Sequence, residues 1–303
     1  RSEVIAVGLA YRLRPWISMG IGMLVLPQVH TVNTVLTPNA AEPADSVLNY
    51  NIENEFDQAI TAGVLVRPLD WLRIGVTFQD ELYLDLNGHN EVQLGGTDTE
   101  EPVEQIIDAV QHYTPPRLSG AIALEGADGW LITAEGTWLG WSRYLDHHGQ
   151  QHSELEDVIN WRLGFEAPLL DDSFVRAGLG WSPSPVPDQT GRSNFVDNDR
   201  VTFAIGAGRD LTLWDQDFTV DLSVQLQTLL ARETTKRVAP DGRYPVCGEG
   251  VTALCDEVAD REVDTPVLAA RDTRGLQTGN PGFPGFSSGG YLISAGVDIK
   301  WRF

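Results

Sequence analysis

The stretch that decides the fold is the C-terminal segment GGYLISAGVDIKWRF, residues Gly289–Phe303. From Tyr291 onward every odd position is apolar, whereas the even positions after Leu292 are small or polar. Because successive side chains of a strand point to opposite faces, this alternation predicts a strand with one apolar and one polar face. Such a strand fits the last strand of a soluble β-sandwich, with its apolar face on a core, and it also fits a transmembrane β-barrel, in which the apolar face contacts lipid.

Ten further segments alternate in the same way. Most exceed the roughly 5–6 residues of a soluble strand and match the roughly 9–11 tilted residues that cross a bilayer. Aromatic residues also gather at their ends, as in the interfacial girdles of membrane barrels. The segments are 4–11, 17–25, 59–66, 72–86, 117–125, 130–144, 159–167, 174–181, 201–208 and 218–230. The aromatic residues at their ends include Trp16, Trp71, Trp130, Tyr144, Trp181, Trp214 and Trp301.

The connections between these segments favour the membrane barrel over the sandwich. Short turns alternate with long excursions, at about 26–52, 87–116, 145–157, 182–200 and 231–290. Outer-membrane barrels have short periplasmic turns and long extracellular loops. We therefore predict one all-β domain over residues 1–303, a transmembrane antiparallel β-barrel of about eleven strands. Because such barrels have an even number of strands with both ends periplasmic, we expect the first strands to be absent from this chain or supplied separately.

Composition narrows the compartment and the partners. The 303 residues carry a net charge of −22, which argues against nucleic acid as a partner. The two cysteines, Cys247 and Cys255, are close in sequence and predict a local disulfide, which implies an oxidising compartment. The three histidines at His147, His148 and His152 match no strong zinc motif. We expect a bacterial outer-membrane protein without cofactor or metal.

One stretch resembles a known family. FVRAGLGWSPSPVPDQTGRSNFVDNDRVTFAIGAG, residues 174–208, contains SPVP at Ser184–Pro187 and DNDR at Asp197–Arg200. It is similar to the penultimate hairpins of the FadL family of outer-membrane transporters for long-chain fatty acids and other hydrophobic compounds. The resemblance implies a fourteen-stranded barrel plugged by an N-terminal hatch, of which this chain would hold the last eleven strands without the hatch.

The same resemblance implies a function. It predicts passive uptake of hydrophobic molecules such as long-chain fatty acids, with outer-membrane lipid, lipopolysaccharide and the solute itself as partners. The alternative is a structural barrel that scaffolds other envelope proteins. Catalysis is not expected, because no strand presents a matching Ser, Asn and His at a common height.

Two external segments are candidates for capturing the solute. In TEEPVEQIIDAVQHY, four apolar residues follow the i, i+3, i+4, i+7 spacing of one helix face: Val103, Ile106, Ile107 and Val110. In NPGFPGFSSGG, Phe283 and Phe286 lie near the same rim. Each segment either packs on its own barrel rim or lines a substrate groove.

Charged residues on the polar strand faces should line the lumen. These residues are Arg117, Glu125, Glu135, Arg162, Glu166, Arg176, Asp221, Lys300 and Arg302. They form either a mutually paired network or, at Arg162 and Arg176, a site for a carboxylate headgroup. The aromatic end, with Trp301 and Phe303, resembles the C-terminal signal that outer-membrane assembly machinery recognises.

Overall fold

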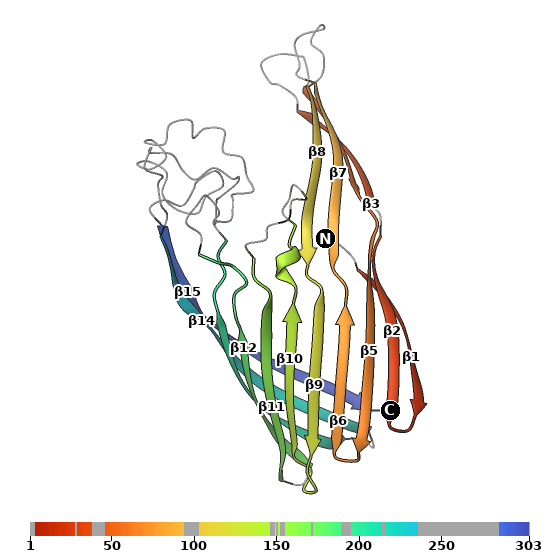
Figure 1. The fold of residues 1–303 in the computed structure, drawn as a ribbon, viewed down its shortest axis with the longest axis vertical. Coiled ribbons are helices and arrows are strands. Elements are labelled where there is room, and N and C mark those ends of the chain that lie inside the picture. The colour runs from red at the N-terminus through yellow and green to blue at the C-terminus, as the bar shows by residue number, and fades with distance from the viewer. Residues whose placement is uncertain are drawn as a thin grey trace.

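The computed structural model describes residues 4–27, 29–37, 46–93, 103–145, 149, 151, 155–170, 172–188, 195–213, 216–235 and 285–302. Most of these residues lie in one antiparallel sheet of eleven strands, in the order β1-β2-β5-β6-β9-β10-β11-β12-β13-β14-β15. Figure 1 shows the sheet curled, with β14 and β15 passing behind β9–β11 in this view. The prediction of an antiparallel barrel wall of about eleven strands is confirmed.

The strands of this sheet are long, as a membrane-spanning barrel requires. Their bounds are β1 Ile5–Arg14, β2 Ile17–Leu26, β5 Asp57–Leu69, β6 Leu72–Gln79, β9 Arg117–Glu125, β10 Leu131–Leu139, β11 Val158–Leu170, β12 Ser173–Ser182, β13 Arg200–Leu213, β14 Gln216–Thr235 and β15 Gly285–Arg302. Short connections join β1 to β2, β5 to β6, β9 to β10, β11 to β12 and β13 to β14. The labelled strands of these pairs turn at the bottom of Figure 1, which we call the turn end, and the opposite end is the loop end.

A second, four-stranded sheet rises above the first at the loop end (Figure 1). It has the order β3-β4-β7-β8, with bounds β3 Val29–Thr37, β4 Ser46–Asn54, β7 Leu82–Gln93 and β8 Val103–Thr114. Its strands continue β2, β5, β6 and β9 after short breaks, so two hairpins extend beyond the barrel wall. A buried apolar cluster holds the junction: Leu26, Ala59, Leu82 and Leu84.

This second sheet corrects three predictions. The segments 26–52 and 87–116, expected as long loops, contain strands, and the single strand expected over 72–86 breaks at Asp80 and Glu81. The helix expected around Val103–Val110 is wrong, because these residues belong to β8, which pairs with β7. Four of those eight residues are β-branched, which favours a strand, and an isolated helix this short is marginal.

The segment expected as a strand over 130–144 also ends earlier. Strand β10 stops at Leu139, and Trp141–Arg143 form one 3-10 turn, η1. Within the described residues, no helix has the length and hydrophobicity needed to cross a bilayer.

The apolar strand faces point away from the protein. Leu9 is 80% exposed and Ile205 is 67% exposed, and comparable side chains follow along β11, β14 and β15. Exposed apolar residues that form a continuous face mark a surface that another apolar phase covers. On a curled sheet of membrane-spanning strands, that phase is lipid.

Candidate functional site

The face opposite the apolar belt carries the charged side chains and is the lumenal wall. Strand register assigns residues to this wall, because directly paired residues share a face. Glu135 on β10 pairs with Arg162 on β11 and with Ala121 on β9, so all three belong to the lumenal face. Their sequence neighbours Ala134, Leu163 and Ile122 lie on the lipid face.

One half of this wall, from β10 to β15, is a chain of ion pairs. Arg162 Nη1 lies 2.9 Å from Glu135 Oε1. Arg176 bridges two carboxylates, with Nε 2.6 Å from Glu166 Oε2 and Nη1 2.8 Å from Asp221 Oδ1. Lys300 Nζ in turn lies 3.3 Å from Asp221 Oδ2 and 3.7 Å from Asp298 Oδ1. Three cations and four carboxylates therefore form a paired network with a net charge of −1.

Arg176 on β12 reaches Asp221 on β14 across the intervening strand β13, because β13 has glycines at the facing positions. Gly206 is the register partner of Arg176, and Gly208 is the partner of both Phe174 and Asp221. A Cβ on Gly208 would overlap the Phe174 ring and the Asp221 carboxylate. The Arg176 guanidinium stacks over this ring, 4.2 Å from its centre, in a cation–π contact.

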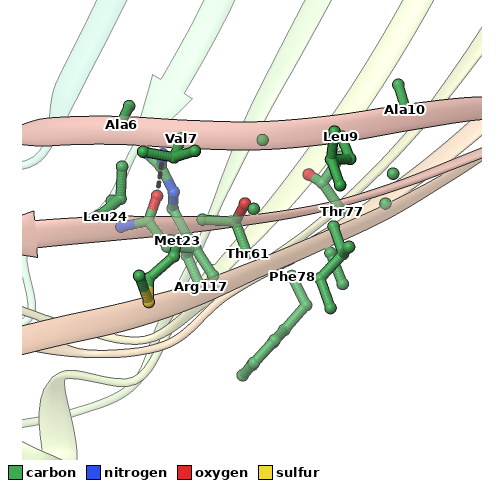
Figure 2. Close-up of a pocket in the computed structure, with 17 residues that line it drawn as sticks. Ala6, Val7, Leu9, Ala10, Met23, Leu24, Thr61, Thr77, Phe78 and Arg117 are labelled. Atoms are coloured by element: carbon green, nitrogen blue, oxygen red, sulfur yellow. Dashed lines mark hydrogen bonds between the residues drawn. The ribbon is translucent and has the colours of Figure 1, made fainter.

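The other half of the wall, from β1 to β9, presents mostly small residues, with the Arg73–Glu125 ion pair near its turn end. The small residues surround a hollow of about 580 Å³, shown in Figure 2. Its lumenal lining comprises Ala6, Gly8, Ala10, Gly20, Gly22, Leu24, Thr61, Gly63, Thr77, Gln79 and Arg117. A neighbouring hollow of about 590 Å³ lies over β5, β6 and β9–β11 and includes Ala121 and Arg162.

Arg117 and Gln79 stand at the loop end of the first hollow. They are register partners, the first residue of β9 and the last residue of β6. Arg117 Nη2 donates to Gln79 Oε1 over 2.5 Å, and Gln79 is only 7% exposed. In Figure 2, Arg117 lies at the same end as Ala6 and Leu24, while Leu9 and Ala10 lie farther along the hollow.

An aromatic cluster forms part of the rim at the loop end. Tyr113 at the end of β8 contacts Trp141 of η1 and Tyr144, with ring centroids 6.4 and 5.6 Å apart, and Tyr144 contacts Phe195 at 6.3 Å. The Tyr113 hydroxyl donates to Glu81 Oε2 over 3.2 Å. Burial, and then the charge of Glu81, raise the pKa of Tyr113 above its usual value, so this phenol stays neutral well into alkaline pH.

The SPVP and DNDR segments meet at the same rim. Asp199 Oδ1 accepts a hydrogen bond from the Ser184 backbone amide at 2.8 Å. The Arg232 guanidinium of β14 donates to the carbonyls of Pro187 and Asp197. Asn198, which is 1% exposed, donates to the carbonyls of Leu230 and Ser288 at 2.8 and 3.1 Å. The two motifs therefore organise the rim around β14 and β15.

Comparison with known proteins agrees with this barrel architecture. The family model described as "Outer membrane protein transport protein (OMPP1/FadL/TodX)" matches residues 3–252. The chain belongs to this family. It is therefore an outer-membrane β-barrel protein, and its turn end faces the periplasm. No curated protein sequence matches the chain.

The chain is also similar to several solved structures. One is the CymD monoaromatic hydrocarbon channel, with 11% identity, a TM-score of 0.48, and 75% of this chain and 69% of that chain covered. Another is the toluene transporter TodX of P. putida, with 13% identity, a TM-score of 0.48, and 77% of this chain and 64% of that chain covered. A third is the toluene transporter TbuX of Ralstonia pickettii, with 12% identity, a TM-score of 0.44, and 76% of this chain and 64% of that chain covered. The matched part spans about two thirds of the length of each of these proteins.

The residues predicted from the sequence fall into three groups in this FadL-family barrel. Arg162 and Arg176 reach the lumenal wall, where both pair with carboxylates. Val103, Ile106, Ile107 and Val110 lie on β8, in the sheet that extends beyond the barrel wall at the extracellular end. Cys247, Cys255, Phe283 and Phe303 lie outside the described residues, so the predicted disulfide concerns that part of the chain.

Two predicted residues lie on β15. Phe286 is half-buried near its extracellular end. Trp301 is exposed near its periplasmic end, stacks on Phe218 at 6.5 Å, and donates through Nε1 to Gln216 Oε1 over 3.0 Å. The role of Trp301 and Phe303 in assembly stays a prediction.

Sequence reasoning missed the rim aromatic cluster and the Arg117–Gln79 pair. Arg117 was expected to face the lumen, but nothing singled out its neutral partner. The signal for the cluster lay in the aromatic residues at the end of β8 and after β10, of which only Tyr144 was predicted, as a girdle residue at a strand end. In the ranges that the structure describes, no group of three or more His, Cys, Asp or Glu side chains is placed to hold a metal ion.

Proposed function

We propose that this protein carries hydrophobic small molecules passively across the outer membrane. The observation that carries the proposal is its membership in the outer-membrane transport family, over residues 3–252. The three solved relatives are named as channels or transporters of toluene and other monoaromatic hydrocarbons. Long-chain fatty acids remain the second substrate class, from the resemblance of residues 174–208.

The physical basis is the transfer of apolar surface. A hydrophobic solute crosses the polar lipopolysaccharide layer poorly, and burial of each CH₂ group stabilises it by about 0.8 kcal/mol. The first hollow, of about 580 Å³, offers such burial beside small residues, and the neighbouring hollow of about 590 Å³ adds apolar surface beside charged side chains. No energy source is required, because the solute only moves down its concentration gradient.

Capture at the extracellular rim belongs to the same proposal. The candidates are the β8 residues Val103, Ile106, Ile107 and Val110, together with Phe283 and Phe286. The aromatic cluster at Tyr113, Trp141, Tyr144 and Phe195 adds rigid apolar surface at this end. Such rings combine a large apolar area with few rotatable bonds.

A matched pair of substitutions tests transport. Ala121 lines the second hollow, whereas Leu118 on the same strand lines neither hollow and is 46% exposed on the lipid face. We expect Ala121→Trp to narrow the lumen and reduce uptake several-fold, and Leu118→Trp to leave uptake unchanged. The measurement is the entry of radiolabelled toluene and of radiolabelled palmitate into vesicles that contain the full-length protein.

Empty vesicles and vesicles with an unrelated porin set the background. Entry of both probes at the background rate would contradict a transporter. If the purified protein then carried stoichiometric envelope partners, the scaffold would become the better explanation. Equal loss of uptake in both variants would show that the lumenal wall is not the route.

A further inference from the structure

We propose that a groove on the lipid-facing side of the barrel wall holds one acyl chain of outer-leaflet lipopolysaccharide. The groove has a volume of about 320 Å³ and lies across β6, β9, β10 and β11. These four strands are neighbours in the sheet and run side by side in Figure 1. The inference goes beyond the proposed transport and does not depend on it, because it concerns the face opposite the lumen.

The floor of the groove consists of two adjacent glycines. Gly120 on β9 and Gly136 on β10 are register partners, and they share the lipid face with Val76 on β6 and Trp161 on β11. A Cβ at Gly120 would meet no other group within 4 Å. The outer surface of the wall is therefore lowered here by the height of a side chain, between neighbours that carry large ones.

Apolar side chains form the sides of the groove. A Cβ at Gly136 would lie 3.0 Å from Cζ3 of Trp161, so the indole ring lies close to the bare backbone of β10. Ile74 and Ile122 form part of the next row toward the periplasm, and both belong to the exposed apolar belt. Of the described residues that line the groove, only Glu135 is charged, and its register places it on the lumenal face.

The surroundings of the groove determine what fills it. The groove is continuous with the apolar belt that lipid covers, and the hydrocarbon region of a bilayer holds no water to occupy it. An empty groove would lose dispersion contacts along its whole lining. A flexible acyl chain follows the groove and contacts protein on three sides, whereas a chain on the convex wall around it contacts protein on one side only. The groove should therefore hold its chain more tightly than the surrounding wall does.

The position of the groove selects the source of the chain. Gly120 is the fourth residue of β9 and Trp161 the fourth residue of β11, counted from the extracellular ends of these strands. The groove therefore extends from the middle of the wall toward the outer leaflet, which lipopolysaccharide forms. The described pairings of β6 with β9, β9 with β10 and β10 with β11 show no register shift, so the wall is continuous here and separates the groove from solute in the lumen.

The first test is native mass spectrometry of the full-length protein in detergent, titrated with purified lipid A or with phosphatidylethanolamine. We expect wild-type protein to retain one lipid A in preference to phosphatidylethanolamine. Gly120→Leu fills the groove from its open floor and should weaken this retention about tenfold, as when about two CH₂ groups lose their burial. Ala295→Leu is the matched control, because it adds the same side chain to the lipid face of β15, where Ala295 pairs with the exposed Val224.

A second measurement locates the chain without filling the groove. Trp161 borders the groove, whereas its register partner Trp181 shares the lipid face and does not line the groove. The fluorescence lost in Trp161→Phe and in Trp181→Phe gives the contribution of each ring in vesicles of phosphatidylcholine with brominated acyl chains. We expect added lipid A, which carries no bromine, to relieve the quenching of Trp161 at a lower concentration than that of Trp181. Folding of each variant is checked by its shift on gels with and without heating.

Three results would overturn the inference. Equal retention of lipid A by wild-type protein and Gly120→Leu would show that the groove is not the site. Retention of phosphatidylethanolamine as strong as that of lipid A would contradict the assignment to the outer leaflet. Relief of the Trp161 quenching by toluene, and not by lipid A, would make the groove a solute site instead. None of these results bears on uptake through the lumen, which the Ala121→Trp and Leu118→Trp pair tests separately.

Discussion

At the scale of single residues, glycines on β13 decide how the lumenal charges pair. Gly208 leaves space that the Phe174 ring and the Asp221 carboxylate fill. Arg176 stacks on this ring and reaches Asp221 on β14 across the intervening strand. With a side chain at Gly208, the ring and the carboxylate would have to move, and the bridge would open.

The corresponding prediction concerns Gly208→Val. We expect it to lower the free energy of unfolding by about 1–3 kcal/mol, since overpacking a filled site costs about this much. The measurement is a urea titration of the protein in phospholipid vesicles, followed by tryptophan fluorescence. Gly120→Val is the control, because a Cβ at Gly120 meets nothing within 4 Å. Equal losses in both variants would argue against the bridge.

At the scale of elements, Asn198 joins the rim segment to the β14–β15 hairpin. The register of the two strands shifts between Leu229 and Arg232, and the side chain of Asn198 donates to the carbonyls of Leu230 and Ser288 beside this shift. Buried carbonyls in an irregular ladder need a donor from elsewhere. The DNDR motif provides that donor.

Replacing this residue should loosen one local region. We expect Asn198→Leu to leave two carbonyls without donors, at a cost of about 1–3 kcal/mol for each such group. Hydrogen exchange should then speed up at least several-fold around Leu230 and Ser288 and remain slow in β11 and β12. Asp188→Asn is the control, as this exposed carboxylate only approaches Arg232 at 3.6 Å. Uniform acceleration over the whole sheet would contradict a local clasp.

At the scale of the whole molecule, the distribution of residues is the reverse of that in a soluble protein, with apolar side chains on the outer face and charged side chains on the lumenal face. Large apolar side chains such as Leu9, Ile205 and Val297 are exposed, while charged residues face the interior of the curled sheet. This arrangement is stable only when lipid covers the belt. The energetics of a substitution should therefore depend on the face it occupies.

A pair of arginine substitutions tests this dependence. Ile205 is 67% exposed on the lipid face of β13, and Gln225 on β14 belongs to the lumenal face. We expect Ile205→Arg to destabilise the protein in bilayers by about 2–4 kcal/mol, the cost of arginine near the midplane on the lipid face of a barrel. Gln225→Arg should cost far less. Reversible urea titrations in vesicles measure both, and equal costs would contradict the assigned faces.

The sequence by itself determined the barrel wall. Eleven alternating segments gave the eleven strands, their faces and their short turns, because a period of two residues is a local property that each strand carries alone. The lumenal position of Arg117, Arg162 and Arg176 followed from the same alternation. The family followed from residues 174–208, whose two motifs form the rim around β14 and β15.

Only the tertiary structure decided the rest. The apolar residues of Val103–Val110 have the spacing of one helix face, but pairing with the preceding strand β7 makes this segment a strand. Likewise, the alternation shows that a cation faces the lumen without showing which carboxylate it meets. That depends on strand register, which puts Arg117 beside the neutral amide of Gln79, and on the glycines of the intervening strand β13, across which Arg176 reaches Asp221.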